Sequence, residues 1–194
     1  MSESIVSLVP YAERERAIAT LVSAFVADPA ERWLYPDAHQ YLTHFPLFVE
    51  AFGGRAFDES TAWQFGNFAA ISLWLPPGTE ADGEATVEVL TRTVSPMLHD
   101  DLFAVLGQMA EAHPTDPHWY LPWFGVDAAR QGSGLGGQLL ANCLTVVDAA
   151  HLPAYLESTN PRNTPFYERH GFEVTGTAQA GASPTIVLMA RPAQ

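Results

Sequence analysis

The segment from Trp123 to Gly137 constrains the fold of this chain more than any other part of the sequence. A strand-like apolar stretch leads into it, and apolar residues at helical spacing follow it. Four glycines occupy the six positions 132–137. Glycine lets the backbone turn its N–H groups toward one point, and the start of the following helix adds partial positive charge. A plain strand-to-helix turn needs fewer glycines, so the pattern favours a seat for a pyrophosphate.

Apolar periodicity predicts strands and helices on both sides of this loop. Before it we expect a strand at 4–9, helices at 11–26 and 41–52, strands at 62–65 and 68–75, a helix from 94 to Pro114 and a strand at 118–126. After it we expect a helix at 134–150, a strand at 154–157, a short helix at 164–170 and strands at 172–176 and 185–190. This order predicts one α/β (α+β) domain over residues 1–194.

Composition narrows the class of partner. Hydrophobic residues make up 47% of the chain, as expected of a folded globular protein, and 9 Lys and Arg face 22 Asp and Glu. A formal charge of -13 repels polyphosphates and anionic membranes, so we expect no nucleic-acid or membrane partner. The N-terminus lacks a signal-peptide pattern, and we expect a cytoplasmic protein. The single Cys143 and the spacing of His113, His118 and His170 predict no metal site.

The glycine loop also fits a dinucleotide-binding pattern. Gly132, Gly134 and Gly137 match G-x-G-x-x-G, and Glu157 follows about 20 residues later at the end of a predicted strand, where a ribose-binding acid would lie. This alternative describes an NAD(P)-dependent oxidoreductase. Its weakness is position, because a doubly wound sheet carries this loop in its first strand–helix unit and here it comes late in the chain.

Two motifs in the second half of the chain resemble the GNAT superfamily of N-acetyltransferases. Gln131-x-x-Gly134-x-Gly136 is similar to its acetyl-CoA pyrophosphate loop, and the stretch from Asn160 to Phe172 is similar to its second signature. The segments 154–158 and 161–169 further resemble the branch that contains puromycin N-acetyltransferase. The resemblance implies a GNAT fold, in which helices flank a mixed central sheet with two splayed parallel strands.

The resemblance also implies acetyl-CoA as the co-substrate, with no metal, and a place for it between the splayed strands. Backbone groups of Phe124 and Val126 would hold the pantetheine arm as an added strand. Asn163 would bind the same arm, or else cap the following helix. Arg130 would meet a phosphate oxygen. The backbone N–H groups of the loop would hold the pyrophosphate; these belong to Gln131, Gly132, Ser133, Gly134, Leu135 and Gly136.

The chemistry requires a neutral amine to attack a thioester while a thiolate leaves. Tyr167 matches the family's tyrosine near the sulfur and would donate a proton to the thiolate; the alternative is a packed aromatic. Glu157 is the candidate base or amine anchor; the alternative is a solvated strand residue, with water taking the proton. Aromatic residues of the N-terminal half and centre would form the acceptor pocket or else pack in the core: Phe25, Trp33, Tyr35, Trp74 and Trp119.

The sequence thus predicts an acyltransferase that moves acetyl from acetyl-CoA directly to a primary amine of a small molecule. A non-catalytic acyl-CoA-binding sensor remains a third class, in which Tyr167 would be dispensable. A homodimer is left open, and so is the identity of the amine.

Overall fold

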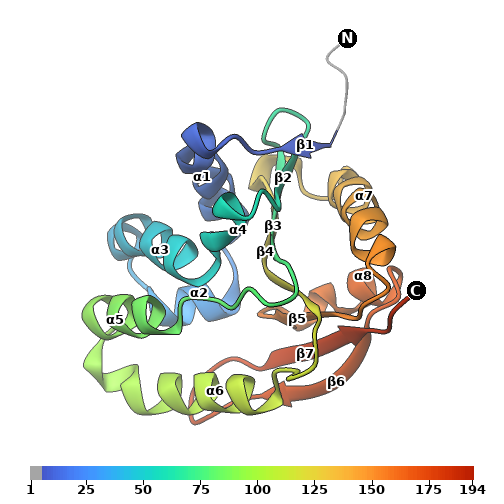
Figure 1. The fold of residues 1–194 in the computed structure, drawn as a ribbon. Coiled ribbons are helices and arrows are strands. Elements are labelled where there is room, and N and C mark those ends of the chain that lie inside the picture. Colours follow the sequence, from blue (N-terminus) through green and yellow to red (C-terminus); the bar gives the residue numbers. More distant parts are fainter. Residues whose placement is uncertain (1–5) are drawn as a thin grey trace.

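The computed structural model describes residues 6–194 and folds them around a seven-stranded mixed sheet (Figure 1). The strand order is β1-β2-β3-β4-β5-β7-β6, and β4 and β5 form a parallel pair among antiparallel neighbours. The bounds are β1 Ser7–Leu8, β2 Ala62–Phe65, β3 Ala70–Leu75, β4 Trp119–Val126, β5 Ala154–Ser158, β6 Glu173–Ala178 and β7 Ile186–Arg191. The expected mixed sheet flanked by helices is confirmed.

Helices cover both faces of the sheet (Figure 1). The eight α-helices are α1 Arg14–Ala24, α2 Pro29–Leu34, α3 Ala38–Gly53, α4 Arg55–Asp58, α5 Gly83–Thr93, α6 His99–Ala112, α7 Leu135–Ala149 and α8 Thr164–Glu168, among the described residues. Because side chains alternate along a strand, each strand supplies two cores. Ile71 and Leu73 pack toward α1 and α3, whereas Ala70 and Trp74 pack toward α7.

Three helices, α2, α4 and α5, were not expected from the sequence. Asp28-Pro29 looked like the stop of a helix, but the Asp28 side chain caps a new one by accepting hydrogen bonds from Ala30 and Glu31, with proline at its first position. Asp82 caps α5 in the same way. The strand expected at 4–9 is reduced to Ser7–Leu8, and its first two residues lie outside the described part of the chain.

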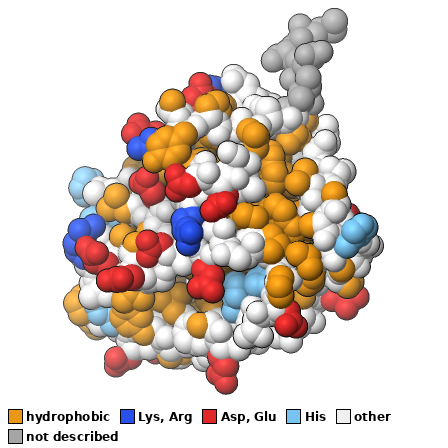
Figure 2. Space-filling view, viewed as in Figure 1, with side chains coloured by type: hydrophobic (Ala, Val, Ile, Leu, Met, Phe, Trp, Pro, Cys, Tyr) orange, Lys and Arg blue, Asp and Glu red, His pale blue; other side chains and the backbone are white. Residues whose placement is uncertain are grey.

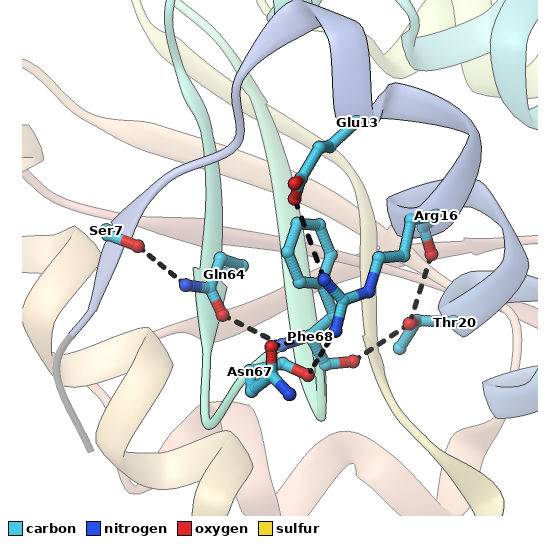
Figure 3. Close-up of polar contacts among 7 residues, drawn as sticks. All are labelled: Ser7, Glu13, Arg16, Thr20, Gln64, Asn67 and Phe68. Atoms are coloured by element: carbon cyan, nitrogen blue, oxygen red, sulfur yellow. Dashed lines mark hydrogen bonds and ion pairs between the residues drawn. The ribbon is translucent and has the colours of Figure 1, made fainter. Parts of the chain in front are cut away.

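The β2–β3 hairpin fastens α1 to the sheet (Figure 3). Asn67 and Phe68 adopt positive φ angles of 56° and 66°, and the Gln64 side chain accepts a hydrogen bond from the Phe68 N–H at 2.8 Å. Thr20 of α1 donates to the Phe68 carbonyl at 2.8 Å, and Arg16 donates to the Asn67 side chain at 2.7 Å. The first two turns of α1 are thereby fixed to the hairpin.

Strands β4 and β5 separate after two paired positions. The parallel register joins Trp119 to Ala154 and Tyr120 to Tyr155. On its other side β4 carries a bulge. Leu73 of β3 pairs with Trp123 and Leu75 pairs with Tyr120, so that an advance of two residues on β3 corresponds to three residues on β4. A bulge bends and twists its strand, and β4 leaves β5 at this point. The predicted splay of the parallel strands follows from this irregularity.

The charged side chains of the protein are mainly acidic. Figure 2 shows acidic side chains scattered over the viewed face, where basic ones are sparse, in keeping with the formal charge of -13. Over residues 6–194, no helix has both the length and the apolar character that a membrane span requires.

Candidate active site

A cavity of about 510 Å³ lies between the glycine loop, the end of α1 and α8. It gathers most of the residues that the resemblance assigned to the cofactor. Its lining includes Phe124, Val126, Gln131, Gly132, Gly134, Gly136, Asn163 and Tyr167. Arg130, Ser133 and Leu135 belong to the same loop but do not line the cavity: the first two are exposed, and Leu135 packs against the core under α7.

The glycine loop has the backbone that its sequence indicates. Gly132 and Gly134 have φ angles of +75° and +82°, a left-handed conformation that L side chains rarely adopt. No atom lies within 4 Å of a Cβ built at either position, so the space above them is open. Gly136 is favoured for another reason, since a Cβ at this position would lie 3.2 Å from Val126 Cγ2, closer than an ordinary van der Waals contact. The first N–H groups of α7 lack intrahelical acceptors and face this region, which suits a pyrophosphate.

Gln131 holds the loop in place through its side chain. Its Nε2 donates to the carbonyl oxygens of Ala24 at 3.1 Å and Val126 at 3.2 Å, and so ties the loop to α1 and β4. The first residue of the glycine motif therefore has a structural task besides any backbone contact with a ligand.

Tyr167 lies in α8 and is 7% exposed. Its ring packs among other aromatic rings. Burial first, and then the charge of Asp28, raise the pKa of its phenol. The hydroxyl therefore keeps its proton at neutral pH and faces the cavity as a donor. Asn163 precedes α8, makes no side-chain cap hydrogen bond and lines the cavity; Asn160 supplies a cap one turn earlier, accepting from Arg162 N–H.

Asp28 joins the cofactor-side cavity to β5, a role that the sequence did not reveal. Its Oδ2 accepts a hydrogen bond from Thr159 Oγ1 at 2.8 Å, and it lines the cavity beside Tyr167. Burial raises its pKa despite the opposing effect of the Thr159 hydrogen bond. The only signal in the sequence was the Asp-Pro pair, which we interpreted as the end of a helix.

Two connected cavities lie on the other face of the sheet. One of about 1030 Å³ and one of about 70 Å³ share Phe52, Leu106, Met109 and Glu157 in their linings. The larger also contains Glu80 and Asp116, and its lining includes no Lys or Arg. Thr159 lines the smaller cavity, and Asp28 lines the cavity beside the glycine loop. The hydrogen bond between their side chains therefore joins the walls of the two cavities.

Glu157 points into these cavities from β5. Its side chain is 5% exposed, so it is not the solvated strand residue of the alternative interpretation. Oε1 lies 3.5 Å from His113 Nδ1. Burial, followed by the charge of Glu157, raises the pKa of both Tyr120 and Tyr155, whose side chains share this face of β4 and β5.

A second carboxylate, Glu31 of α2, lines the small cavity and was not anticipated. Glu31 is 2% exposed, and its Oε2 has no hydrogen-bond partner among the described residues. Burial, and then the charge of Asp28, raise its pKa well above the ordinary value. The indole N–H groups of Trp33 and Trp123, which also line this cavity, are likewise without partners there. The chamber thus offers polar groups of both kinds to a small ligand.

The five aromatic residues expected around the acceptor are dispersed. Trp33 lines the small cavity and Phe25 lines the cofactor-side cavity. Tyr35 is fully buried, contacts Thr93 and has a pKa raised to about 12 by burial. Trp74 and Trp119 pack under α7, because their positions on β3 and β4 point to that face. The three buried residues line none of the three cavities, so their assignment to a pocket is corrected.

The sheet also removes the dinucleotide alternative. The glycine loop follows β4 in a mostly antiparallel sheet, whereas a dinucleotide fold places it after the first strand of a parallel one. No cluster of three or more His, Cys, Asp and Glu side chains within residues 6–194 has a metal-binding arrangement.

Comparison with known proteins agrees with this geometry. The family model described as Acetyltransferase (GNAT) domain matches residues 99–174. An uncharacterized N-acetyltransferase of Schizosaccharomyces pombe is 30% identical over 179 residues, which cover 81% of this chain and 70% of that protein. The chain belongs to the GNAT family of acetyltransferases, whose members use acetyl-CoA as the co-substrate.

Solved structures of low sequence identity share the fold. An acetyltransferase of Corynebacterium glutamicum described as histone acetyltransferase HPA2 and related is 21% identical, with a TM-score of 0.66 over 98% of this chain and 97% of that one. Arylalkylamine N-acetyltransferase 2 of Aedes aegypti is 12% identical, with a TM-score of 0.67 over 100% of both chains. The C-terminal condensation domain of Ebony, bound to beta-alanyl-dopamine, is 11% identical, with a TM-score of 0.70 over 98% of this chain and 99% of that one.

Proposed function

We propose that this acetyltransferase moves the acetyl group of acetyl-CoA directly to a primary amine of a small molecule. The observation that carries the proposal is the gap beyond Tyr120 and Tyr155. A glycine-loop cavity with Tyr167 opens on one face of the sheet there, and an acidic cavity with Glu157 opens on the other. A thioester held in the gap would meet both groups.

The free edge of β4 supports the place of the cofactor. Beyond Tyr120, β4 pairs with β3 on one side and, within residues 6–194, with no strand on the other, so the backbone groups of Phe124 and Val126 are available to an extended pantetheine arm. The N–H groups of the glycine loop would hold the pyrophosphate at the start of α7. The acetyl-CoA thioester supplies the activated acyl group, and the chain's own residues orient it and manage the protons.

Glu157 and Tyr167 divide those protons between them. Glu157 takes a proton from the incoming ammonium, so that a neutral amine attacks the thioester carbon. Tyr167 donates a hydrogen bond to the sulfur as negative charge develops on it. Because the pKa of Tyr167 is raised by burial, complete transfer would leave an unfavourable buried tyrosinate. We therefore replace the expected proton donation by hydrogen-bond stabilisation of the thiolate.

The acceptor-side cavities support a small amine with an apolar or aromatic body. The small cavity combines Glu31 and Glu157 with the rings of Trp33, Phe48 and Phe52, and carboxylates with aromatic faces suit a cationic ligand. The similarity of segments 154–158 and 161–169 to the puromycin N-acetyltransferase branch favours the same class. Proteins of similar fold act on arylalkylamines, as the Aedes aegypti enzyme's name states.

A panel of amines, puromycin included, tests this proposal. We expect release of free thiol from acetyl-CoA with at least one small primary amine, and an acetylated product of matching mass. Incubation without amine controls for hydrolysis. Histone-like or ribosomal peptides that react far faster than every small amine would contradict the acceptor class. Binding of acetyl-CoA without turnover of any amine would instead favour the non-catalytic sensor.

A further inference from the structure

Glu157 is the buried end of a chain of contacts that leads to the surface. His113 Nδ1 lies 3.5 Å from Glu157 Oε1, and His113 Nε2 lies 3.0 Å from His118 Nε2. His118 Nδ1 lies 2.8 Å from the backbone carbonyl oxygen of Asp116. The accessible fraction rises along this chain from 5% for the Glu157 side chain to 32% for that of His113. All four residues line the larger acceptor-side cavity.

The contact between His118 and the Asp116 carbonyl determines which ring nitrogens in the other contacts carry hydrogen. A carbonyl oxygen only accepts, so His118 Nδ1 carries a hydrogen and donates to Asp116. If His118 is neutral, its Nε2 is a bare acceptor, and His113 Nε2 must donate to it. A neutral His113 then turns the lone pair of Nδ1 toward the Glu157 carboxylate. Two acceptors facing each other at 3.5 Å repel, unless a proton lies between them.

The contacts therefore favour one proton beyond those of a carboxylate and two neutral imidazoles, shared along the His113–His118 hydrogen bond and the 3.5 Å contact with Glu157. That proton has three positions, which are Glu157 as a carboxylic acid, His113 as an imidazolium, or His118 as an imidazolium. With the proton at any of these positions, one hydrogen lies between Glu157 and His113 and one between His113 and His118. Moving the proton from Glu157 to His118 carries it from the acceptor site toward the solvent. A histidine pair joined through its ring nitrogens can make these transfers without moving its side chains.

We propose that His113 and His118 form a relay that carries the acceptor's proton from Glu157 to the solvent. This inference rests on the proposed function. An acceptor that enters as an ammonium gives one proton to Glu157, and its nitrogen then bonds to the acetyl carbon as the carbon–sulfur bond breaks. The second nitrogen proton neutralises the thiolate. One proton per turnover is left over. His118 releases its Nδ1 hydrogen to water, which replaces the contact with the Asp116 carbonyl, and the rings turn back to their starting hydrogens before the next turnover.

The surroundings confine the mobile charge to the relay. The rings of Tyr120 and Tyr155 lie 4.8 Å and 4.9 Å from that of His113, and burial, followed by the charge of Glu157, raises the pKa of both phenols, so they stay neutral. The other ionisable groups that line the cavity are the carboxylates of Glu80 and Asp116.

Two variants of His118 test the relay. In His118→Gln the new side-chain amide still contacts His113 but cannot pass a proton. In His118→Ala the missing imidazole leaves room for a small base. We expect kcat in dilute buffer to fall by about tenfold in both, below the range for loss of a general base itself. Added imidazole should restore the rate of His118→Ala and leave that of His118→Gln low. The KM for acetyl-CoA should be unchanged, and His151→Ala, at an exposed histidine outside the cavities, should resemble the wild type.

The relay acts when Glu157 is reset between turnovers, so the test compares steady-state rates with an amine whose product release does not limit turnover. Wild-type steady-state rates for both His118 variants in dilute buffer would overturn the relay. So would a loss of rate in His118→Ala that imidazole does not repair, because that result describes a structural role.

Side-chain ¹⁵N NMR of the histidines tests the same inference without turnover. We expect His118 to carry a hydrogen on Nδ1, and Glu157 with the two histidines to hold one proton more than a carboxylate and two neutral rings. Glu157→Gln should abolish that extra proton. Two neutral rings in the wild type, both with hydrogens on Nδ1, would refute the relay, because two bare Nε2 atoms would then face each other. If no amine releases thiol but NMR finds the extra proton, the proposed function is wrong, whereas the proton-sharing contacts between Glu157 and the histidines stand.

Discussion

Replacing Tyr167 by Phe isolates the role of one hydroxyl group. The ring is packed against Phe124, Phe166 and Phe172, with centroid separations of 6.4, 5.1 and 5.9 Å, and Phe preserves these contacts. The hydroxyl makes no hydrogen bond to another described residue that the change would break, although Asp28 is near enough to raise its pKa. The free energy of unfolding and the affinity for acetyl-CoA should therefore stay close to the wild-type values.

The expected loss of rate follows from the kind of hydrogen bond that is removed. A hydrogen bond to a charged group contributes about 1.5–3 kcal/mol, and 1.4 kcal/mol corresponds to a factor of ten. Because the hydroxyl meets full negative charge only as the carbon–sulfur bond breaks, kcat should fall by roughly 10–150-fold. kcat and kcat/KM should fall together, since the interaction is made mainly in the transition state.

Thiol release with an amine from the panel, followed under single-turnover conditions, measures this loss. A series of acetyl thioesters adds a sharper readout, because a more basic thiolate depends more on the hydrogen bond. Tyr167→Phe should therefore slow poor leaving groups more than good ones.

Two results would refute this reasoning. Full turnover of Tyr167→Phe, while chemistry limits the rate, would assign the thiolate to water or another group and leave Tyr167 as a packing residue. A loss that is uniform along the thioester series, together with weaker binding of acetyl-CoA, would indicate a role in placing the cofactor.

Two further predictions concern binding and stability. Gly134→Val should abolish micromolar binding of acetyl-CoA in calorimetry, because valine is strained by about 1–3 kcal/mol at a φ of +82°. The control Gly107→Ala, at an open helical position, should bind acetyl-CoA normally. Unchanged affinity in folded Gly134→Val would exclude the loop as the pyrophosphate site. Burial raises the pKa of Glu31 above 4.5, so folding favours its protonated form and the wild type should lose stability as the pH rises above that value. Glu31→Gln should flatten this decline in Tm between pH 5 and 8, and an equal decline in both proteins would show that Glu31 does not cause it.

The sequence predicted the elements whose signals are local. Periodicity along the chain was sufficient to predict α7 and β4, and the positive φ angles of Gly132 and Gly134 agree with glycine's conformational freedom. Family resemblance added the mixed central sheet and the splay of its parallel strands. Local patterns failed at α2, because an Asp-Pro pair both ends one helix and caps the next.

The site itself depended on contacts between distant segments. Nothing in the local sequence brings Asp28 to Thr159, or His113 to Glu157, since each pair joins elements that only the folded sheet places together. The facing of Trp74 and Trp119 was misjudged for a related reason, because one position along a strand decides whether a ring faces a cavity or α7.

By itself, the sequence determined a glycine loop at the start of a helix, an acetyltransferase signature and an acidic chain with candidates at Tyr167 and Glu157. Only the tertiary structure decided that a bulge in β4 opens the gap, that Glu31 and Asp28 are buried beside it, and that two histidines connect Glu157 to the surface. The physical reason is that backbone conformation responds to neighbouring residues, whereas burial, charge and proton position depend on which side chains the completed fold brings together.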